Sequence, residues 1–218
     1  MNSHDQILQQ IRTALGRREG QLPPAPPPVR LRVPEVSMEA RIASATARLE
    51  ALAARVCRAE TPQAAGAWVA GWLGNRTAVA SNSSFLNECG IRRLPGVRSG
   101  ITDRDELRNL CAACDVGISS ADYLLSDTGT LVLLSSPEEA RMVSLLPPSH
   151  LALLPVHRLL SGPDELFSVL PHPSSVTSSM VWITGPSRTA DIEQILVRGV
   201  HGPGQLTVLL VDSDIPPI

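Results

Sequence analysis

The sequence predicts an α/β protein in which a mainly parallel sheet lies between helices. Hydrophobic residues make up 43% of the 218 residues, which is enough for a substantial core. Short apolar runs typical of buried strands alternate along the chain with segments whose apolar residues fall at helical spacing. One main domain is therefore expected over 37–218, preceded by an N-terminal helix and a proline-rich linker over 1–36.

The first 36 residues are expected to form an arm with no core of its own. Ser3-His-Asp-Gln6 has the form of a capping box, and an amphipathic helix should follow that ends at Gly16. Its apolar stripe consists of Ile7, Leu8, Ile11 and Leu15. Leu22-Pro-Pro-Ala-Pro-Pro-Pro28 then predicts an extended linker. The arm either folds back on its own domain or docks on a neighbouring chain, and the sequence favours neither.

Helices and strands then alternate through the first half of the main domain. Apolar residues three and four apart, up to Val56, predict a helix from about Met38 to Arg55. Thr61-Pro62 is a cap followed by proline, which opens a helix through Trp72. Thr102–Asp105 is another capping box, at the start of a helix that runs through Cys111. The strands expected between and after these helices are Thr77–Ala80 and Val116–Ile118.

The second half predicts a hairpin and further parallel strands. Ser126-Asp-Thr-Gly129 has a glycine that can take the positive φ of a turn, so its flanking β-rich runs should pair antiparallel. A helix should begin with the Ser161–Asp164 cap and end near Leu170. The expected strands are Tyr123–Leu125, Thr130–Leu134, Leu151–Pro155, Val181–Thr184 and Leu206–Val211.

The segment after Val181 carries the strongest candidate for an anion site. Gly185-Pro186 should stop the strand, and Ile192, Ile195 and Leu196 fall at helical spacing, which places Ser187, Arg188 and Thr189 at a helix N-terminus. Free N–H groups, the helix dipole and the Arg188 guanidinium would favour a phosphate or carboxylate there. Helix capping alone is the competing interpretation. The unit from Val181 to Val211 would be a right-handed βαβ crossover.

Composition excludes several classes of function. The net charge is −2, the pI is about 6.2 and only six residues are aromatic, which disfavours nucleic-acid binding. No apolar run reaches the roughly 20 residues of a membrane helix, and the N-terminus does not resemble a secretory leader, so a cytoplasmic protein is expected. All 19 basic residues are Arg, which excludes Schiff-base chemistry and a lysine-containing phosphate loop.

The sequence predicts no metal and no cofactor. Its four cysteines are too few and too scattered for an iron–sulfur site. Cys111-Ala-Ala-Cys114 has the spacing of a redox pair, but a position near a helix C-terminus disfavours a thiolate. His150 and His157, seven residues apart, lack a metal-ligand spacing and are expected to be structural.

Candidate chemical groups gather at expected strand ends, where open α/β sheets bind ligands. Asp122 lies in a β-rich run, where a carboxylate is disfavoured without a partner. It is therefore a better acid/base candidate than Asp127. Asp127 and Thr128 could bind a hydroxyl or assist proton transfer, or could simply form the turn. His201 would suit proton transfer if it faced the same crevice, or could be a surface histidine. Asp191 could orient Arg188, whereas Glu193 fits a helix-dipole role.

Four blocks together closely resemble the lactate-utilization protein C family, which consists of a LUD domain. They are Gly117–Leu131, Ser144–His150, Thr184–Glu193 and Gly199–Pro203, in the order of the family. Positions matching its signature are Asp122, Asp127, Thr128, Gly129, Thr130, Gly185, Ser187, Arg188, Thr189, Asp191, Glu193 and His201. The chain departs mildly from the family at Ser119, Ser120 and Leu125.

The resemblance implies a fold like that of sugar-phosphate isomerases and coenzyme A transferases. It also implies an accessory, cluster-free role in bacterial oxidation of L-lactate to pyruvate, beside iron–sulfur subunits. The hypothesis is that a small anionic ligand binds between the Asp127 turn and Ser187, with Arg188 holding the anion. The rival hypotheses are an independent isomerase, hydrolase or transferase acting on a phosphate- or CoA-bearing substrate, and a ligand-sensing or assembly subunit. A homo-oligomer is compatible with each of them.

Overall fold

A computed structural model describes residues 3–18, 20–21, 31, 33–189 and 197–212 of the chain. The chain divides into two units, Met1–Arg30 and Leu31–Ile218, and each is considered by itself. In the first unit, helix α1 spans Ser3–Ala14 as predicted, and its side chains Ile7 and Ile11 are exposed. The proline-rich segment lies outside the described residues.

A six-stranded sheet forms the centre of the second unit. Its strand order is β1-β12-β7-β4-β2-β3, and every neighbouring pair is parallel. The strands are β1 (Arg55–Ala59), β2 (Ala78–Ala80), β3 (Val97–Arg98), β4 (Val116–Ser120), β7 (Ser149–Pro155) and β12 (Gln205–Val211). Every residue of β7 is buried, as expected for a parallel strand covered on both faces. The predicted parallel sheet between helices is confirmed.

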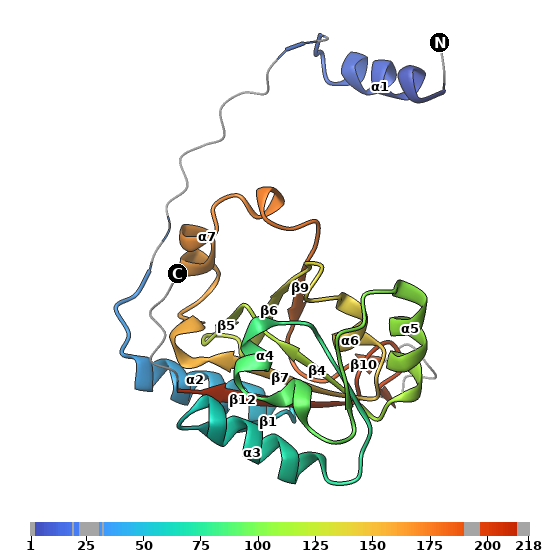
Figure 1. Cartoon of the computed structure of the whole chain (residues 1–218). Helices are drawn as coiled ribbons and strands as arrows, with labels where there is room; N and C mark the ends of the chain where they lie inside the picture. Colours follow the sequence, from blue (N-terminus) through green and yellow to red (C-terminus); the bar gives the residue numbers. More distant parts are fainter. Residues whose placement is uncertain (1–2, 19, 22–30, 32, 190–196, 213–218) are drawn as a thin grey trace. The chain divides into compact units, whose positions relative to one another are not determined.

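One face of this sheet is covered by α3 (Pro62–Leu73), by α4 (Ser84–Glu88) and by a 3₁₀ turn, η1 (Ile91–Arg93) (Figure 1). The predicted cap of α3 is present, because the Thr61 hydroxyl accepts a hydrogen bond from Ala64 N–H at 3.1 Å. Leu86 and Ile91 are fully buried against this face, together with Leu151 and Leu153 of β7. Within the described ranges, no helix has both the length and the apolar character needed to cross a membrane.

The opposite face is covered by helices and by a second, smaller sheet. The helices are α2 (Met38–Ala51), α5 (Arg104–Ala113) and α6 (Arg141–Leu145). The small sheet has the order β8-β5-β6-β9, with β5 (Tyr123–Leu125), β6 (Thr130–Leu134), β8 (Leu159–Leu160) and β9 (Met180–Ile183). β5 and β6 pair antiparallel around Gly129, whose φ is +67°, so the predicted hairpin is confirmed. The remaining short elements are η2 (Val156–Arg158), α7 (Pro163–Val169), η3 (Pro173–Ser175), β10 (Arg188–Thr189) and β11 (Val197–Arg198).

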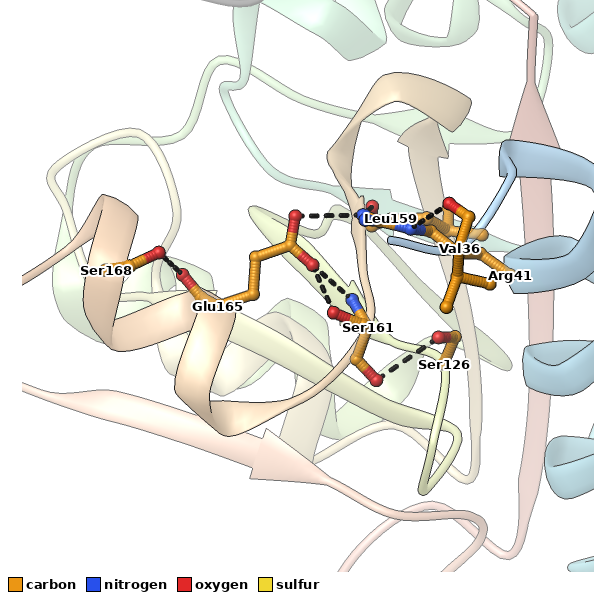
Figure 2. Close-up of polar contacts among 7 residues, drawn as sticks. All are labelled: Val36, Arg41, Ser126, Leu159, Ser161, Glu165 and Ser168. Atoms are coloured by element: carbon orange, nitrogen blue, oxygen red, sulfur yellow. Dashed lines mark hydrogen bonds and ion pairs between the residues drawn. The ribbon is translucent and has the colours of Figure 1, made fainter. Parts of the chain in front are cut away.

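A charged network ties α2 to the small sheet and to α7 (Figure 2). Arg41 Nη1 lies 2.9 Å from Glu165 Oε1 and also donates to the Leu159 carbonyl at 2.9 Å. Glu165 Oε2 accepts hydrogen bonds from both the backbone N–H, at 2.6 Å, and the hydroxyl of Ser161. Burial would raise the pKa of Glu165, but the bonds from Ser161 and Arg41 outweigh burial and lower it. The Glu165 carboxylate therefore stabilises this junction in its charged form.

The cap of α5 is Asp103, which accepts a hydrogen bond from Glu106 N–H at 2.8 Å, and not the predicted Thr102. Three predictions of larger elements are also wrong. Helix α2 ends at Ala51 rather than near Arg55, because Ala53 takes a φ of +64° and the chain then enters β1. Strand β9 pairs antiparallel with β6 in the small sheet, so no βαβ crossover joins it to β12. Arg188 and Thr189 form β10, which pairs antiparallel with β11, and so do not begin a helix. The residues expected in that helix, Ile192, Ile195 and Leu196, lie outside the described ranges.

Candidate functional site

A cavity of about 700 Å³ opens at the carboxyl edge of the large sheet, where β2, β4 and β7 end. Its lining includes Ser83 after β2, Ser120 and Asp122 at the end of β4, and Arg158 after β7. Loops at this edge are the usual ligand-binding position in open α/β sheets. The cavity is large enough for a small metabolite.

The order of the strands explains why a crevice forms here. From β2 the chain crosses to β3 by way of α4 and η1, on one face of the sheet. From β4 it crosses to β7 by way of the small sheet and α6, on the other face. Adjacent strands whose connections leave in opposite directions open a gap between their carboxyl ends. Ser83 and Ser120 face each other across this gap, with their hydroxyl oxygens 2.9 Å apart.

Glu139, from the loop between β6 and α6, is the most unusual ionisable group in the cavity. Its Oε1 accepts hydrogen bonds from Ser81 Oγ at 2.9 Å, from Ser120 N–H at 3.0 Å and from the Ser120 hydroxyl. Burial raises the pKa of Glu139 to about 7, against the effect of these bonds, and nearby Asp122 acts in the same direction as burial. Among the described residues, all three bonds go to Oε1, which leaves Oε2 as the oxygen for a ligand. A carboxyl group with this pKa can accept or donate a proton near neutral pH.

Asp122, the acid/base candidate from the sequence, lines the same cavity, apart from Asp127, Ser187 and Arg188. It also has a structural role, because its Oδ2 accepts a hydrogen bond from Leu134 N–H at 2.6 Å where β5 and β6 begin to pair. Burial raises the pKa of Asp122, while the bond from Leu134 and the charge of Arg158 oppose that rise. Asp122 therefore adds one hydrogen bond at the end of the β5–β6 pair and places a second carboxylate near Glu139.

Cationic and neutral nitrogen groups lie on the same cavity. Buried Nε of Arg92 and buried Nδ1 of His157 have no hydrogen-bond partner among the described residues. Arg158 lies with its guanidinium carbon 5.8 Å from the centre of the Tyr123 ring. Burial, together with the charge of Arg158, lowers the pKa of His157. Buried polar groups normally have partners, so the two unpaired nitrogens make this cavity a candidate for a ligand-binding site.

The Asp127 turn and the segment after β9 lie next to each other, but they do not line this cavity. Thr130 Oγ1 lies 2.9 Å from Thr184 Oγ1, and the Thr130 hydroxyl donates a hydrogen bond to Thr128 Oγ1 at 2.8 Å. Asp127 is exposed at the hairpin tip and its N–H bonds to Ser161 O at 3.1 Å. Gly129 packs so tightly on α2 that an added Cβ would lie 2.9 Å from Arg48 Cβ.

Arg188 is exposed, and its guanidinium donates to the carbonyl of Leu52 at the C-terminal end of α2. That contact suits a cation near a helix C-terminus, so the structure gives Arg188 a local partner. Gly185, Ser187 and His201 line a second, smaller cavity at the opposite edge of the large sheet. The predicted residues Asp191 and Glu193 lie outside the described ranges.

Sequence reasoning missed Glu139, Arg92 and Arg158, and assigned His157 only a structural role. One usable signal was present, because Glu139 follows the Ser135-Ser-Pro137 loop directly after a predicted strand.

The four cysteines are free, and burial raises the pKa of Cys111 to about 11. In the described part of the chain, no three His, Cys, Asp or Glu side chains cluster as metal ligands.

The model of the LUD domain family matches residues 42–211, which is well over half of the chain. The chain belongs to the LUD domain family. The resemblance indicated by the four sequence blocks is thus confirmed at the level of the family. The matched range starts within α2 and ends with β12, so it includes the six-stranded and the four-stranded sheet of this LUD domain.

Several curated relatives of this LUD domain carry the name lactate utilization protein C. The protein of Bacillus subtilis is 41% identical over 103 residues, which cover 45% of this chain and 43% of that protein. The protein of Macrococcus caseolyticus is 37% identical over 147 residues, which cover 64% and 63%. The chain therefore spans less than two thirds of the length of the curated relatives it matches.

A solved structure shares the fold of this LUD domain. The crystal structure of a DUF162 family protein from Deinococcus radiodurans superposes with a TM-score of 0.62. The match covers 81% of this chain and 99% of that chain, at 18% sequence identity. This similarity shows a common fold.

Proposed function

We propose that this LUD domain is an accessory component of a lactate-utilization system, and that its carboxyl-edge cavity binds a small 2-hydroxy or 2-oxo carboxylate. Two observations support the proposal. The curated relatives are named for lactate utilization. The cavity brings Arg92 and Arg158 together with the cavity-facing carboxyl group of Glu139. The single observation that carries the choice of an anionic ligand is that two arginines, Arg92 and Arg158, line the same cavity.

The chemistry of the cavity fits both ends of such a ligand. An Arg guanidinium matches a carboxylate in charge and geometry, and burial strengthens the hydrogen bonds between them. The neighbouring 2-hydroxyl or 2-oxo group could then bond to Glu139 Oε2 or to the unpaired Nδ1 of His157. Asp122 and an ionised Glu139 would repel an anion, so binding should be tightest when Glu139 carries its proton.

The proposed partners are iron–sulfur subunits that accept the electrons when L-lactate is oxidised to pyruvate. The family resemblance implies these partners. This chain would bind the substrate or product carboxylate and hold it for the iron–sulfur subunits. On this view the LUD domain works in the cytoplasm as part of an assembly, and its cavity must still bind the carboxylate within that assembly.

The experiment is reconstitution of L-lactate oxidation from the partner subunits with and without this chain. Pyruvate formation should require the chain and should fall when Arg92→Ala replaces wild type. Arg93→Ala is the matched control, because Arg93 lies in the same 3₁₀ turn but is exposed and does not line the cavity. Full activity of the partners without this chain would refute the accessory role.

An independent enzyme is a second candidate, which the protonation behaviour of Glu139 favours. A buried carboxyl group with a pKa near 7 suits general acid–base catalysis on an isomerase or transferase substrate. Turnover of sugar phosphates or acyl thioesters by the purified single chain, abolished by Glu139→Gln, would establish this alternative. Absence of turnover with retained carboxylate binding would leave the accessory role standing.

A further inference from the structure

The second cavity, of about 180 Å³, lies at the amino edge of the large sheet. It is bounded by the starts of β7 and β12, by β9 and the turn after it, and by the loop from His201 to Pro203. Ser187 N–H donates to Pro203 O at 2.9 Å, and Gly204 N–H donates to Pro148 O at 3.0 Å. These bonds fix the loop against the large sheet, so the walls of the cavity are defined by the fold.

His150, the second residue of β7, is a polar residue in the apolar layer between the two sheets. Its side chain is only 1% exposed and lines the cavity, and its Nε2 lies 2.9 Å from Ser119 Oγ. Its Nδ1 is buried and has no hydrogen-bond partner in the described part of the chain. Burial lowers the pKa of His150 to about 4, so the imidazole is neutral at physiological pH. An unpaired buried nitrogen destabilises a fold unless another group bonds to it.

The rest of the lining defines the chemistry of the group that would bond there. Among the described residues the lining contains no Asp, Glu, Arg or Lys, and His201, which is exposed, is the only other ionisable residue there. Val181, Ile183 and Leu206 supply apolar surface, while Ser187 supplies a hydroxyl. A carboxylate or phosphate would have to lose water here without a buried cation to replace it, which is unfavourable.

We propose that this cavity is a second ligand site, which takes a small uncharged molecule whose polar group bonds to His150 Nδ1 and whose apolar part packs against β9. Its volume of about 180 Å³ admits a compact amide, alcohol or carbonyl compound. The proposal does not rest on the proposed function. It assigns Gly185, Ser187 and His201 to a neutral-ligand site rather than to an anion site.

Isobutyramide and isobutyrate form a matched pair of probes, because they share a shape and differ in charge. The amide can donate and accept, so it can bond to either tautomer of His150. With full-length protein labelled with ¹⁵N-histidine, isobutyramide should shift the Nδ1 resonance of one neutral imidazole and should reach saturation. Isobutyrate should leave that resonance unchanged. Occupation by water only, seen as no saturable shift with the amide, would overturn the proposal, as would an equal response to isobutyrate.

A double variant tests whether His150 is the contact. Ser119→Ala/His150→Leu removes both hydrogen-bonding partners together, so no buried polar group is left unpaired and the fold should survive. Isobutyramide affinity should fall about tenfold, the equivalent of one hydrogen bond. His172→Leu is the control, since this exposed imidazole lies away from the cavity and its loss should leave affinity unchanged. Unchanged affinity in a folded double variant would contradict the assignment to this cavity.

Discussion

Glu139 accepts two hydrogen bonds from Ser120, one from the backbone N–H at 3.0 Å and one from the hydroxyl. Ser120 is the last residue of β4, and Glu139 comes from the loop between β6 and α6. This contact therefore joins the carboxyl edge of the large sheet to the connection that crosses over it. The same contact fixes one carboxylate oxygen and leaves the other for the cavity.

Glu139→Gln should change the pH dependence of stability. The pKa of Glu139 rises from an ordinary value of 4.5 to about 7 on folding. Between these values the folded state holds a proton that the unfolded state releases, so the free energy of unfolding falls as pH rises through that window. Glutamine keeps the acceptor oxygen for Ser81 and Ser120 and does not ionise. The variant should therefore be more stable than wild type above pH 7, by up to about 3 kcal/mol, with little difference near pH 4.

Urea unfolding followed at several pH values measures this difference. Glu138→Gln is the control, because the Glu138 side chain is exposed beside Glu139 in the sequence. If the free energies of unfolding of wild type and Glu139→Gln differed by a constant amount between pH 4.5 and about 7, Glu139 would have the same pKa in the folded and unfolded states.

Glu165→Gln should have the opposite pH signature. The pKa of Glu165 is lowered on folding, so its ionised form stabilises the fold at pH values above its ordinary 4.5. That stabilisation is lost as pH falls through the folded pKa. At neutral pH the variant should lose about 1–3 kcal/mol, because the partly buried Arg41 loses its charged partner.

The matched control for Glu165 is Glu39→Gln. Glu39 also pairs with an arginine, Arg58, at 3.1 Å, but its side chain is 74% exposed. Exposed pairs contribute little, so this change should cost less than about 1 kcal/mol. Equal losses in the two variants, measured by thermal unfolding at neutral pH, would contradict the structural role given to the Arg41–Glu165 pair.

Gly117→Ala should destabilise the domain strongly. A Cβ at this position in β4 would lie 1.9 Å from the Val143 carbonyl oxygen of α6, so the helix would have to move. Overpacking against backbone should cost about 3 kcal/mol or more. Gly71→Ala, at an open position inside α3, should instead stabilise by about 0.5–1 kcal/mol. Chemical unfolding measures the free energy of unfolding of both variants. An unchanged free energy in Gly117→Ala would show that α6 does not pack on β4 as described.

Local signals predicted most of the elements because their causes are local. Thr61 caps α3 through its own hydroxyl, and Gly129 supplies the positive φ that the hairpin needs. The failures occur where a local pattern fits two structures. Val56 continues the helical spacing of α2 and yet belongs to β1, because the turn at Ala53 comes first. Ser187 resembles a helix cap, but its N–H bonds to Pro203, sixteen residues further along the chain.

The candidate site could be predicted only in part for the same reason. Asp122 was accessible to sequence reasoning because a carboxylate in a β-rich run is unusual on its own. Arg92, Glu139 and Arg158 come from three different connections, and only the strand order of the large sheet brings them to one cavity. Their roles depend on burial and on unpaired atoms, which short sequence patterns do not encode.

The most direct test of the carboxyl-edge site is calorimetric titration of L-lactate and pyruvate into wild type, Arg92→Ala and Arg93→Ala. Arg92→Ala should weaken binding by about 10- to 100-fold, the loss of a charge-assisted hydrogen bond, with stability retained because the buried Nε has no hydrogen-bond partner among the described residues. Arg93→Ala should bind as wild type does. Equal affinity in all three proteins, or no saturable binding of either acid to wild type, would contradict the account.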